Sequence, residues 1–236
     1  MKLLDLPQAV RERRMFGFFD DFEWYLAPHR WTSLTSDAGT AVAVGTTTPN
    51  GAVVLTTPAV DNSECAVGTT TRPLRPADDK PVMLECRIQY AEAAVNSANI
   101  FVGVADTLAA ADLLLDNGQG PRPGLHGAGL YKVDGESTWR VVSVRGGVPL
   151  ITASTVPAGG PAPQTLRLEI QPLDASVAEV VFHIDDSQVR DAVGFPVKHL
   201  FPLAACPALQ AGVYLKAGAN AAESLAVDYI ALYQLR

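Results

Sequence analysis

Residues 84–90 read Leu-Glu-Cys-Arg-Ile-Gln-Tyr, and residues 166–171 read Leu-Arg-Leu-Glu-Ile-Gln. In both stretches apolar and polar side chains alternate strictly, which is typical of a β-strand with one face on a core and the other in water. Burying one Leu, Ile or Val contributes about 1.5–3 kcal/mol, so a slip of one residue, which turns every side chain to the other face, is costly. The two stretches therefore predict an antiparallel sheet.

Further strands and turns follow the same pattern along the chain. More apolar runs predict buried strands at Ala41–Gly45, Ala52–Thr56, Asn99–Val104, Trp139–Val144, Val177–Ile184, Ala211–Lys216 and Leu225–Tyr233. Turn-forming residues lie between them, at Asn50-Gly51, Asp134-Gly135, Gly146-Gly147, Gly159-Gly160-Pro161 and Asp185-Asp186. About a dozen short strands with regular turns indicate a sandwich or barrel. We predict an all-β, antiparallel β-sandwich as a single domain over residues 18–236, preceded by an N-terminal arm at residues 1–17.

Two segments depart from the strand pattern. Residues 107–116 are rich in helix-forming Ala and Leu, which predicts one or two helical turns, and residues 117–124 form a Gly- and Pro-rich loop. Such an excursion between strands either carries function or covers a sheet edge, and we favour the cover. In the arm, Pro7 followed by Gln8–Met15 fits the start of a short helix.

Composition excludes several classes of protein. Hydrophobic residues make up 48% of the 236 residues and charged residues 18%, unlike a disordered chain, and the net charge of -7 argues against a nucleic-acid partner. No apolar run approaches the length of a membrane helix, and the N-terminus lacks the apolar core of a secretory signal. Cys65, Cys86 and Cys206 match no zinc motif and form no closed disulfide set. We expect them to be buried thiols of a chain made in a reducing cytoplasm.

The charge is unevenly distributed. Residues 1–14 carry four basic and two acidic side chains, whereas the rest carries 14 basic and 23 acidic ones. Basic arms on acidic bodies commonly dock on a partner or another copy, although a frayed terminus is the alternative. The predicted partner-binding residues are Lys2, Leu3, Leu4, Leu6, Val10, Arg11, Arg13 and Arg14.

The sequence offers no catalytic motif. The acids Glu85 and Glu169 are expected to be solvated and paired with arginine, whereas a glycosidase needs two carboxylates about 5–10 Å apart on one cleft. The histidines have no paired spacing, and His183 is expected on the outer face of a strand; all four are His29, His126, His183 and His199. We therefore predict no enzyme, no cofactor and no metal.

A calcium site and an aromatic sugar-binding surface are two further candidate sites. The best calcium ligands in the sequence are Asp106, Asp112, Asp116 and Asn117, but their spacing matches no calcium loop and favours solvated turn residues. A sugar platform needs exposed aromatic rings. The three tryptophans lie in or near predicted strands, which favours a core role for Trp24, Trp31 and Trp139.

Three segments resemble the concanavalin A-like, laminin-G-like jelly rolls. Phe19-Asp20-Asp21-Phe22 followed by Trp31 resembles the opening strand of that family. Residues 182–189 resemble its F-x-I-D-G-x-x-V hairpin, with Asp186 in place of Gly, and Leu225–Tyr233 resembles its closing strand. The resemblance implies a jelly-roll sandwich.

A narrower resemblance is to tailed-phage virion proteins. It rests on residues 51–57, the L-E-x-R-I pattern from Leu84, residues 101–106 and the Ala-rich segment 108–115, and it covers residues 18–236. This resemblance implies a capsid decoration or head-fibre protein that binds by surface shape and has no catalytic residues to transfer.

The resulting hypothesis is a non-enzymatic phage virion structural protein. We expect a capsid decoration (cement) protein made in the bacterial host cytoplasm and bound to the major capsid protein on the capsid exterior. It would also bind its own copies, with a trimer favoured, and neither nucleic acid nor membrane. The alternative is a carbohydrate-binding module or adhesin on a phage tail or head fibre, and a third reading is a glycoside hydrolase or lyase.

Overall fold

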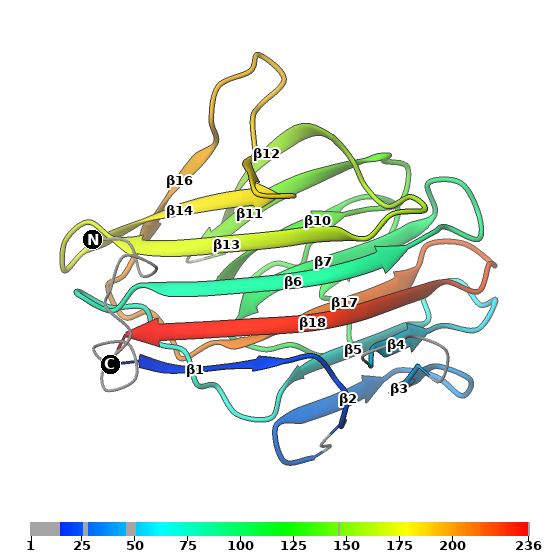
Figure 1. Cartoon of the computed structure of the whole chain (residues 1–236). Helices are drawn as coiled ribbons and strands as arrows, with labels where there is room; N and C mark the ends of the chain where they lie inside the picture. The colour runs from blue at the N-terminus through cyan, green and yellow to red at the C-terminus, as the bar shows by residue number, and fades with distance from the viewer. Residues whose placement is uncertain (1–14, 26–27, 46–50, 146, 236) are drawn as a thin grey trace.

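Two large antiparallel sheets pack face to face in the computed structural model (Figure 1), which describes residues 15–25, 28–45, 51–145 and 147–235. The predicted all-β antiparallel sandwich is confirmed. No helix occurs among these residues, so none of them forms a helix that could cross a membrane.

The nine-stranded sheet contains both strictly alternating segments, residues 84–90 and 166–171. Its order is β15 (Ser187–Gln188), β14 (Val177–Ile184), β13 (Gln164–Pro172), β6 (Val82–Tyr90), β18 (Ser224–Leu235), β4 (Val53–Thr56) and β3 (Ala41–Val44). In addition, β1 (Met15–Asp20) pairs with β18 and β16 (Lys198–Pro202) pairs with β14. Residues 15–17, which the sequence analysis placed in the arm, thus pair within this sheet, while residues 1–14 lie outside the described residues.

The seven-stranded sheet packs behind it. Its order is β12 (Val148–Pro157), β11 (Thr138–Arg145), β10 (Gly127–Lys132), β7 (Ala98–Ala105), β17 (Gln210–Ala217), β5 (Glu64–Thr69) and β2 (Trp31–Thr35). A separate small hairpin pairs β8 (Leu114–Leu115) with β9 (Gly120–Pro121). Each large sheet contributes one face to the main core between them.

The alternation sets which face of each strand enters that core. Leu168 lies in register with Leu84 on one side and Phe182 on the other, and all three are buried. Trp31 and Trp139 are fully buried as expected, but the core prediction is wrong for Trp24, which is 76% exposed. Trp24 follows β1 in a bend outside the strands, where Phe22 fills the core position instead.

The excursion between β7 and β10 is not helical, so the prediction of helical turns at residues 107–116 is wrong. Asp112 and Asn117 have φ angles of 51° and 53°, which a right-handed helix does not allow. The leucines of this segment pack onto the outer face of the seven-stranded sheet and form a second core there, with Leu108, Leu113, Leu114 and Leu125 buried. The excursion is a cover, as we favoured, but over a sheet face rather than a sheet edge.

The hairpin with Asp in place of Gly keeps its turn. Asp185 and Asp186 connect β14 to β15 and have φ angles of 49° and 62°. Two successive left-handed residues define a type I′ turn, which fits the right-handed twist of a hairpin, and Asp tolerates this conformation better than most residues. Asp185 also accepts a hydrogen bond from the Thr165 N–H at 2.8 Å, which fixes the turn to β13.

The cysteines are free and buried, as predicted for Cys65, Cys86 and Cys206. Burial raises the pKa of each thiol, which keeps the thiols protonated near neutral pH.

Candidate functional site

The outer face of the seven-stranded sheet gathers chemically distinctive residues in parallel cross-strand rows. One row consists of glycines and the next is aromatic; they contain Gly68, Gly212, Gly103 and Gly129, and then Tyr214, Phe101 and Tyr131. The third row is polar and contains Glu64 on β5, Lys216 on β17 and Asn99 on β7. Such a face has the elements of a binding surface: flat backbone, ring faces and hydrogen-bonding groups.

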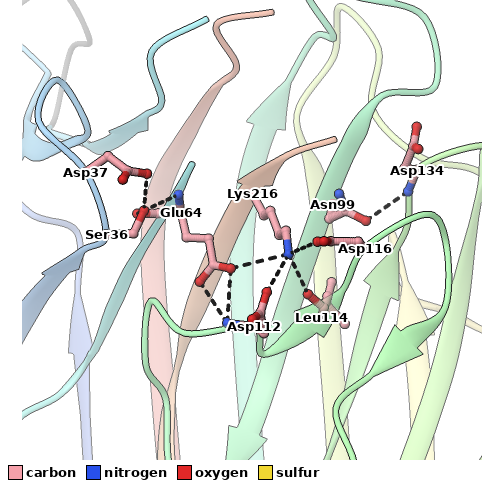
Figure 2. Close-up of polar contacts among 9 residues, drawn as sticks. All are labelled: Ser36, Asp37, Glu64, Asn99, Asp112, Leu114, Asp116, Asp134 and Lys216. Atoms are coloured by element: carbon pink, nitrogen blue, oxygen red, sulfur yellow. Dashed lines mark hydrogen bonds and ion pairs between the residues drawn. The ribbon is translucent and has the colours of Figure 1, made fainter. Parts of the chain in front are cut away.

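The cover over this face is fastened by Lys216, whose side chain is completely buried (Figure 2). Its Nζ lies 2.7 Å from Asp112 Oδ1 and 2.5 Å from Asp116 Oδ1, two carboxylates of the cover. It also donates to the Leu114 carbonyl at 3.2 Å and lies 3.4 Å from Glu64 Oε1. Both oxygens of Glu64 accept from the Asp112 N–H at 3.0 Å.

The pKa directions describe a charged network. Burial alone would lower the pKa of Lys216, but the carboxylates of Asp112 and Asp116 outweigh it and raise that pKa. Hydrogen bonding to Lys216 lowers the pKa of Asp112, whereas burial raises the pKa of Glu64. The ammonium group therefore occupies the centre of the oxygen cluster.

The calcium candidates thus come together only in part. Asp112 and Asp116 bind an ammonium group, while Asp106 accepts a hydrogen bond from the His126 N–H at 3.2 Å instead. Within the described ranges no group of three or more His, Cys, Asp or Glu side chains could hold a metal ion. His199 is buried, and its ring nitrogens are hydrogen-bonded to Ser143 and Thr152.

The free energy needed to lift the cover shows that the outer face of the seven-stranded sheet stays covered. Lifting the cover would expose four buried leucines at about 1.5–3 kcal/mol each, or about 6–12 kcal/mol. The whole stability of a domain is about 5–15 kcal/mol, so the cover opens about as rarely as the protein unfolds. The Lys216 cluster is therefore structural, and an accessible site must lie elsewhere.

The outer face of the nine-stranded sheet is open and crossed by a polar row. Tyr229 on β18 donates a hydrogen bond of 2.8 Å to Glu85 on β6. Arg167 on β13 lies in register with Glu85 and contacts its Oε2 at 3.3 Å and Glu169 Oε1 at 3.4 Å. Both acids pair with an arginine, as predicted, but Glu85 pairs with Arg167 of the neighbouring strand rather than with Arg87 of its own, and both acids are half-buried rather than solvated. What the sequence did not reveal is that both acids flank the same guanidinium group, because strand register fixes that contact.

Aromatic rings border this row. The Phe19 side chain is 54% exposed, and its ring centroid lies 5.1 Å from that of Tyr229 with an interplanar angle of 33°. Burial, together with the neighbouring Glu85 carboxylate, raises the pKa of Tyr229 to about 12, so its hydroxyl remains a donor. Arg87 and Asp228 form an ion pair at 2.9 Å beside the rings. His183 lies in register with Arg167 on the same face, as predicted.

We name the residues that form this surface the polar-aromatic face: Phe19, Glu85, Arg87, Arg167, Glu169, Asp228 and Tyr229. Its charged groups are already paired and differ in exposure: Arg87 and Asp228 are 45% and 30% exposed, whereas Glu85, Arg167 and Glu169 are 22%, 16% and 18% exposed. The face therefore offers carboxylate, guanidinium and hydroxyl groups together with a ring surface to solvent.

A second open surface is apolar and lies where β12 and β16 meet. A pocket of about 160 Å³ is lined there by Val148 and Leu150 of β12, by Leu200, Phe201 and Pro202 of β16, and by the polar Ser143 and Arg145 of β11. The loop of residues 189–197, between β15 and β16, projects beyond the sandwich next to this edge (Figure 1). We name this region the apolar edge.

The predicted partner-binding residues of the arm cannot be placed. Lys2, Leu3, Leu4, Leu6, Val10, Arg11, Arg13 and Arg14 lie outside the described residues.

Comparisons with known proteins identify the fold. No family model matches the chain, and neither does any curated protein. Among solved structures, the endo-1,3-beta-glucanase from Streptomyces sioyaensis aligns with a TM-score of 0.60 and 14% identity, covering 94% of this chain and 96% of that one. The metal-free carbohydrate recognition domain of Emp46p aligns with a TM-score of 0.56 and 13% identity, covering 86% of this chain and 87% of that one.

An endo-beta-1,4-glucuronan lyase from Trichoderma reesei also aligns, with a TM-score of 0.55 and 10% identity, covering 91% of this chain and 94% of that one. The glucanase and the lyase are enzymes that share this fold. The fold and the missing sequence motifs therefore do not argue against catalysis, and the prediction that the chain is not an enzyme is wrong. None of these matches names a phage virion protein. What they share with this chain is the architecture, and the protein is a concanavalin A-like jelly-roll sandwich.

Proposed function

We propose that the protein binds carbohydrate on the polar-aromatic face of the nine-stranded sheet. The observation that carries this proposal is the exposed Phe19–Tyr229 ring pair beside the Glu85–Arg167–Glu169 row. Sugar rings present C–H faces that pack on aromatic rings, and their hydroxyls suit carboxylate and guanidinium groups, which accept or donate two hydrogen bonds in one plane.

The comparisons support the ligand class. One aligned structure is a carbohydrate recognition domain, and another is an enzyme named for a glucan. Within the polar-aromatic face, the Arg167 guanidinium lies between the two carboxylates, in the space that a reacting glycosidic bond would need. That arrangement favours binding as the primary role of this face.

A glycan array followed by calorimetry with the best hit tests the proposal. Phe19→Ala should weaken binding at least tenfold, because it removes the stacking ring from an exposed site without emptying the core. Val95→Ala is the matched control, since Val95 is 89% exposed and lies in a loop after β6. An empty array, or unchanged affinity in Phe19→Ala, would contradict the proposal.

A cleavage assay on the same glycans addresses catalysis. Glu85→Gln and Glu169→Gln each keep the size of the side chain and remove its charge. If the wild type cleaves a bound polysaccharide and either variant abolishes cleavage while binding persists, the face is an active site. If binding occurs without cleavage, it is a binding site.

A second candidate is the virion role that the sequence resemblance implies, and the apolar edge favours it. Of the 12 large hydrophobic side chains exposed among the described residues, Val148, Leu150 and Leu200 line the pocket of that edge, and Val193 and Phe195 lie in the neighbouring loop. Gathered exposed apolar side chains mark surfaces that are covered by other proteins. We propose the major capsid protein as that partner on the capsid exterior, with the basic arm as an additional contact.

Co-purification with virus particles tests this second candidate. A chain lacking residues 1–14 keeps β1 and should fold but detach from particles. Equal particle binding by the truncated and full chains would exclude a role for the arm.

A further inference from the structure

We propose that Lys216 and Asp112 join in an intramolecular amide bond between their side chains, which closes the cover over the seven-stranded sheet covalently. This inference goes beyond carbohydrate binding and does not depend on it.

The two reacting groups are held against each other (Figure 2). The Lys216 side chain is completely buried, and its Nζ lies 2.7 Å from Asp112 Oδ1. Lys216 is fixed because β17 pairs with β5 on one side and with β7 on the other. Asp112 is fixed because its N–H donates to both oxygens of Glu64 at 3.0 Å. An amine and a carboxyl group held in place in this way react as if one were present at an effective concentration of up to about 10⁵–10⁸ M.

Glu64 supplies the third group that amide formation needs, a carboxyl that carries protons between the other two. Its side chain is 4% exposed, and its Oε1 lies 3.4 Å from Lys216 Nζ. Hydrogen bonds from Lys216 and from Glu64 lower the pKa of Asp112, so Glu64 reaches both partners. Burial raises the pKa of Glu64, which suits a group that must both accept and release a proton.

The position of Glu64 favours Asp112 over Asp116 as the partner of Lys216. Asp116 Oδ1 also contacts the ammonium group, at 2.5 Å. Within the described residues, however, the hydrogen bonds that Glu64 makes to the cover go to Asp112. Only the Asp112 carboxyl therefore has both the amine and the proton carrier beside it.

The buried surroundings favour an uncharged product. Tyr214 precedes Lys216 by two residues on the same face of β17 and is fully buried in the second core. Charges held away from water cost free energy, and an amide replaces an ammonium and a carboxylate by one neutral group. Asp112 and Asp116 raise the pKa of Lys216, so the ammonium form prevails before the reaction. The reaction starts from the smaller population in which the amine has given its proton to the carboxylate.

The step balances without a co-reactant. A proton passes from the Lys216 ammonium to the Asp112 carboxylate through Glu64, and the neutral Nζ attacks Cγ of Asp112 to form the C–N bond. Glu64 then takes a proton from the nitrogen and gives it to the departing hydroxyl, the Cγ–O bond breaks, and one water molecule leaves. No atom is oxidised or reduced. The Asp112 side chain is 62% exposed, so the water has a path to solvent.

The bond has a consequence for stability. It links residues 104 positions apart along the chain. A cross-link over so long a loop restricts the unfolded chain strongly, and it keeps the cover attached to β17 when the rest of the sheet opens.

The mass of the denatured full chain tests the proposal. Lys216→Arg keeps the positive charge but cannot form the amide, and it serves as the reference, so that any processing at the N-terminus cancels. After allowance for the substituted side chain, most wild-type chains should be lighter than the reference by the mass of one water molecule. A wild type without this loss would overturn the proposal, and this measurement decides it even where a variant at the site fails to fold.

Digestion with trypsin locates the bond. Trypsin should fail to cleave after Lys216, and the peptides that contain Lys216 and Asp112 should be recovered as one branched species. Lys132 is the matched control within the same chain, because it is also completely buried and its Nζ lies 2.5 Å from Glu92 Oε1. In the part of the chain that the structure describes, Lys132 forms an ion pair with that one carboxylate, and trypsin should cleave after it. Equal cleavage after Lys132 and Lys216 would contradict the bond.

Three variants separate the roles of the acids. Asp112→Ser should abolish the loss of water, whereas Asp116→Ser should retain it. Glu64→Gln keeps the size of the side chain but removes the proton carrier, and it should lower the cross-linked fraction at least tenfold at a fixed time after refolding. A loss of water that persists in Asp112→Ser, or one that is as fast in Glu64→Gln as in the wild type, would show that the assigned groups are wrong.

Discussion

The indole N–H of Trp31 donates a hydrogen bond of 2.8 Å to Oδ2 of Asp20, which ties β2 of the seven-stranded sheet to the end of β1 in the nine-stranded sheet. The same carboxylate accepts from Arg30 at 3.0 Å and from the Phe22 N–H at 3.0 Å. This contact gives a physical reason for the spacing between the Phe-Asp-Asp-Phe element and the following tryptophan.

Asp20→Ala should destabilise the protein by about 2–3 kcal/mol, because it leaves the buried Trp31 N–H and the Phe22 N–H without their acceptor. Urea unfolding followed by tryptophan fluorescence measures the change. Asp21→Ala is the matched control: Asp21 is exposed, and its loss should cost less than about 0.5 kcal/mol. Equal effects of the two substitutions would show that the link between the sheets contributes nothing.

Lys216→Met should cost about 3–5 kcal/mol, because it leaves Glu64 buried without the charge that compensates it. The double variant Lys216→Met with Glu64→Leu should recover part of that loss, since it removes both charges. Lys198→Met is the control. It removes the ion pair between Glu179 and Lys198, a lysine that is 52% exposed, and should change the free energy of unfolding by less than about 1 kcal/mol. If Lys216→Met behaved like Lys198→Met, the cover would not depend on the buried cluster.

Stability should fall as the pH drops from about 6.5 to 4, in part through His199. Burial lowers the pKa of His199 to about 4, so the unfolded chain takes up a proton in this range that the folded chain refuses. The free energy of unfolding is not reduced by His199 above pH 6.5, where the histidine is neutral in both states, and it is lower by about 3 kcal/mol at pH 4. His199→Gln should be less stable at neutral pH and lose less stability on acidification. His29→Gln, at an exposed histidine, is the matched control for replacing a histidine by glutamine.

Leu108→Ala should destabilise the protein by about 2–5 kcal/mol, because Leu108 is buried at the row of glycines under the cover. Leu173, which is 59% exposed, provides the control, and Leu173→Ala should cost less than about 0.5 kcal/mol.

A methyl group at Gly68 tests the same contact from the sheet. It would lie 3.0 Å from Leu108 Cδ1, with nothing else closer than that side chain. Gly68→Ala should therefore be destabilising alone but tolerated in the Leu108→Ala background, where space has been made. Strictly additive free energies of unfolding would show that Leu108 does not pack on Gly68.

Strands with a clear period of two or a long apolar run were predictable, including β7 and β17, which are buried on both faces, whereas several others were not. β6 and β13 alternate because one of their faces meets solvent, while β14 and β18 were predicted from apolar runs. In contrast, β10 reads Gly-Ala-Gly-Leu-Tyr-Lys and is buried on both faces, so nothing in its pattern separates it from a loop. β12 was missed for the opposite reason, since it is an exposed edge strand with prolines.

The candidate site was less accessible to prediction than the fold. Glu85 and Glu169 stood out in the sequence as strand acids beside arginine, but their shared contact with Arg167 depends on the pairing of β6 with β13. The exposure of Phe19 and its approach to Tyr229 depend on the pairing of β1 with β18, between residues more than 200 positions apart.

The sequence by itself determined the all-β sandwich, the alternating strands β6 and β13 and the buried thiols, because hydrophobic burial acts on each residue where it stands in the chain. Only the tertiary structure decided that the 106–126 excursion closes one sheet face, that Lys216 fastens it, and that the other face and the apolar edge stay open. Those outcomes depend on contacts between distant segments, whose geometry is set by strand register and not by local pattern.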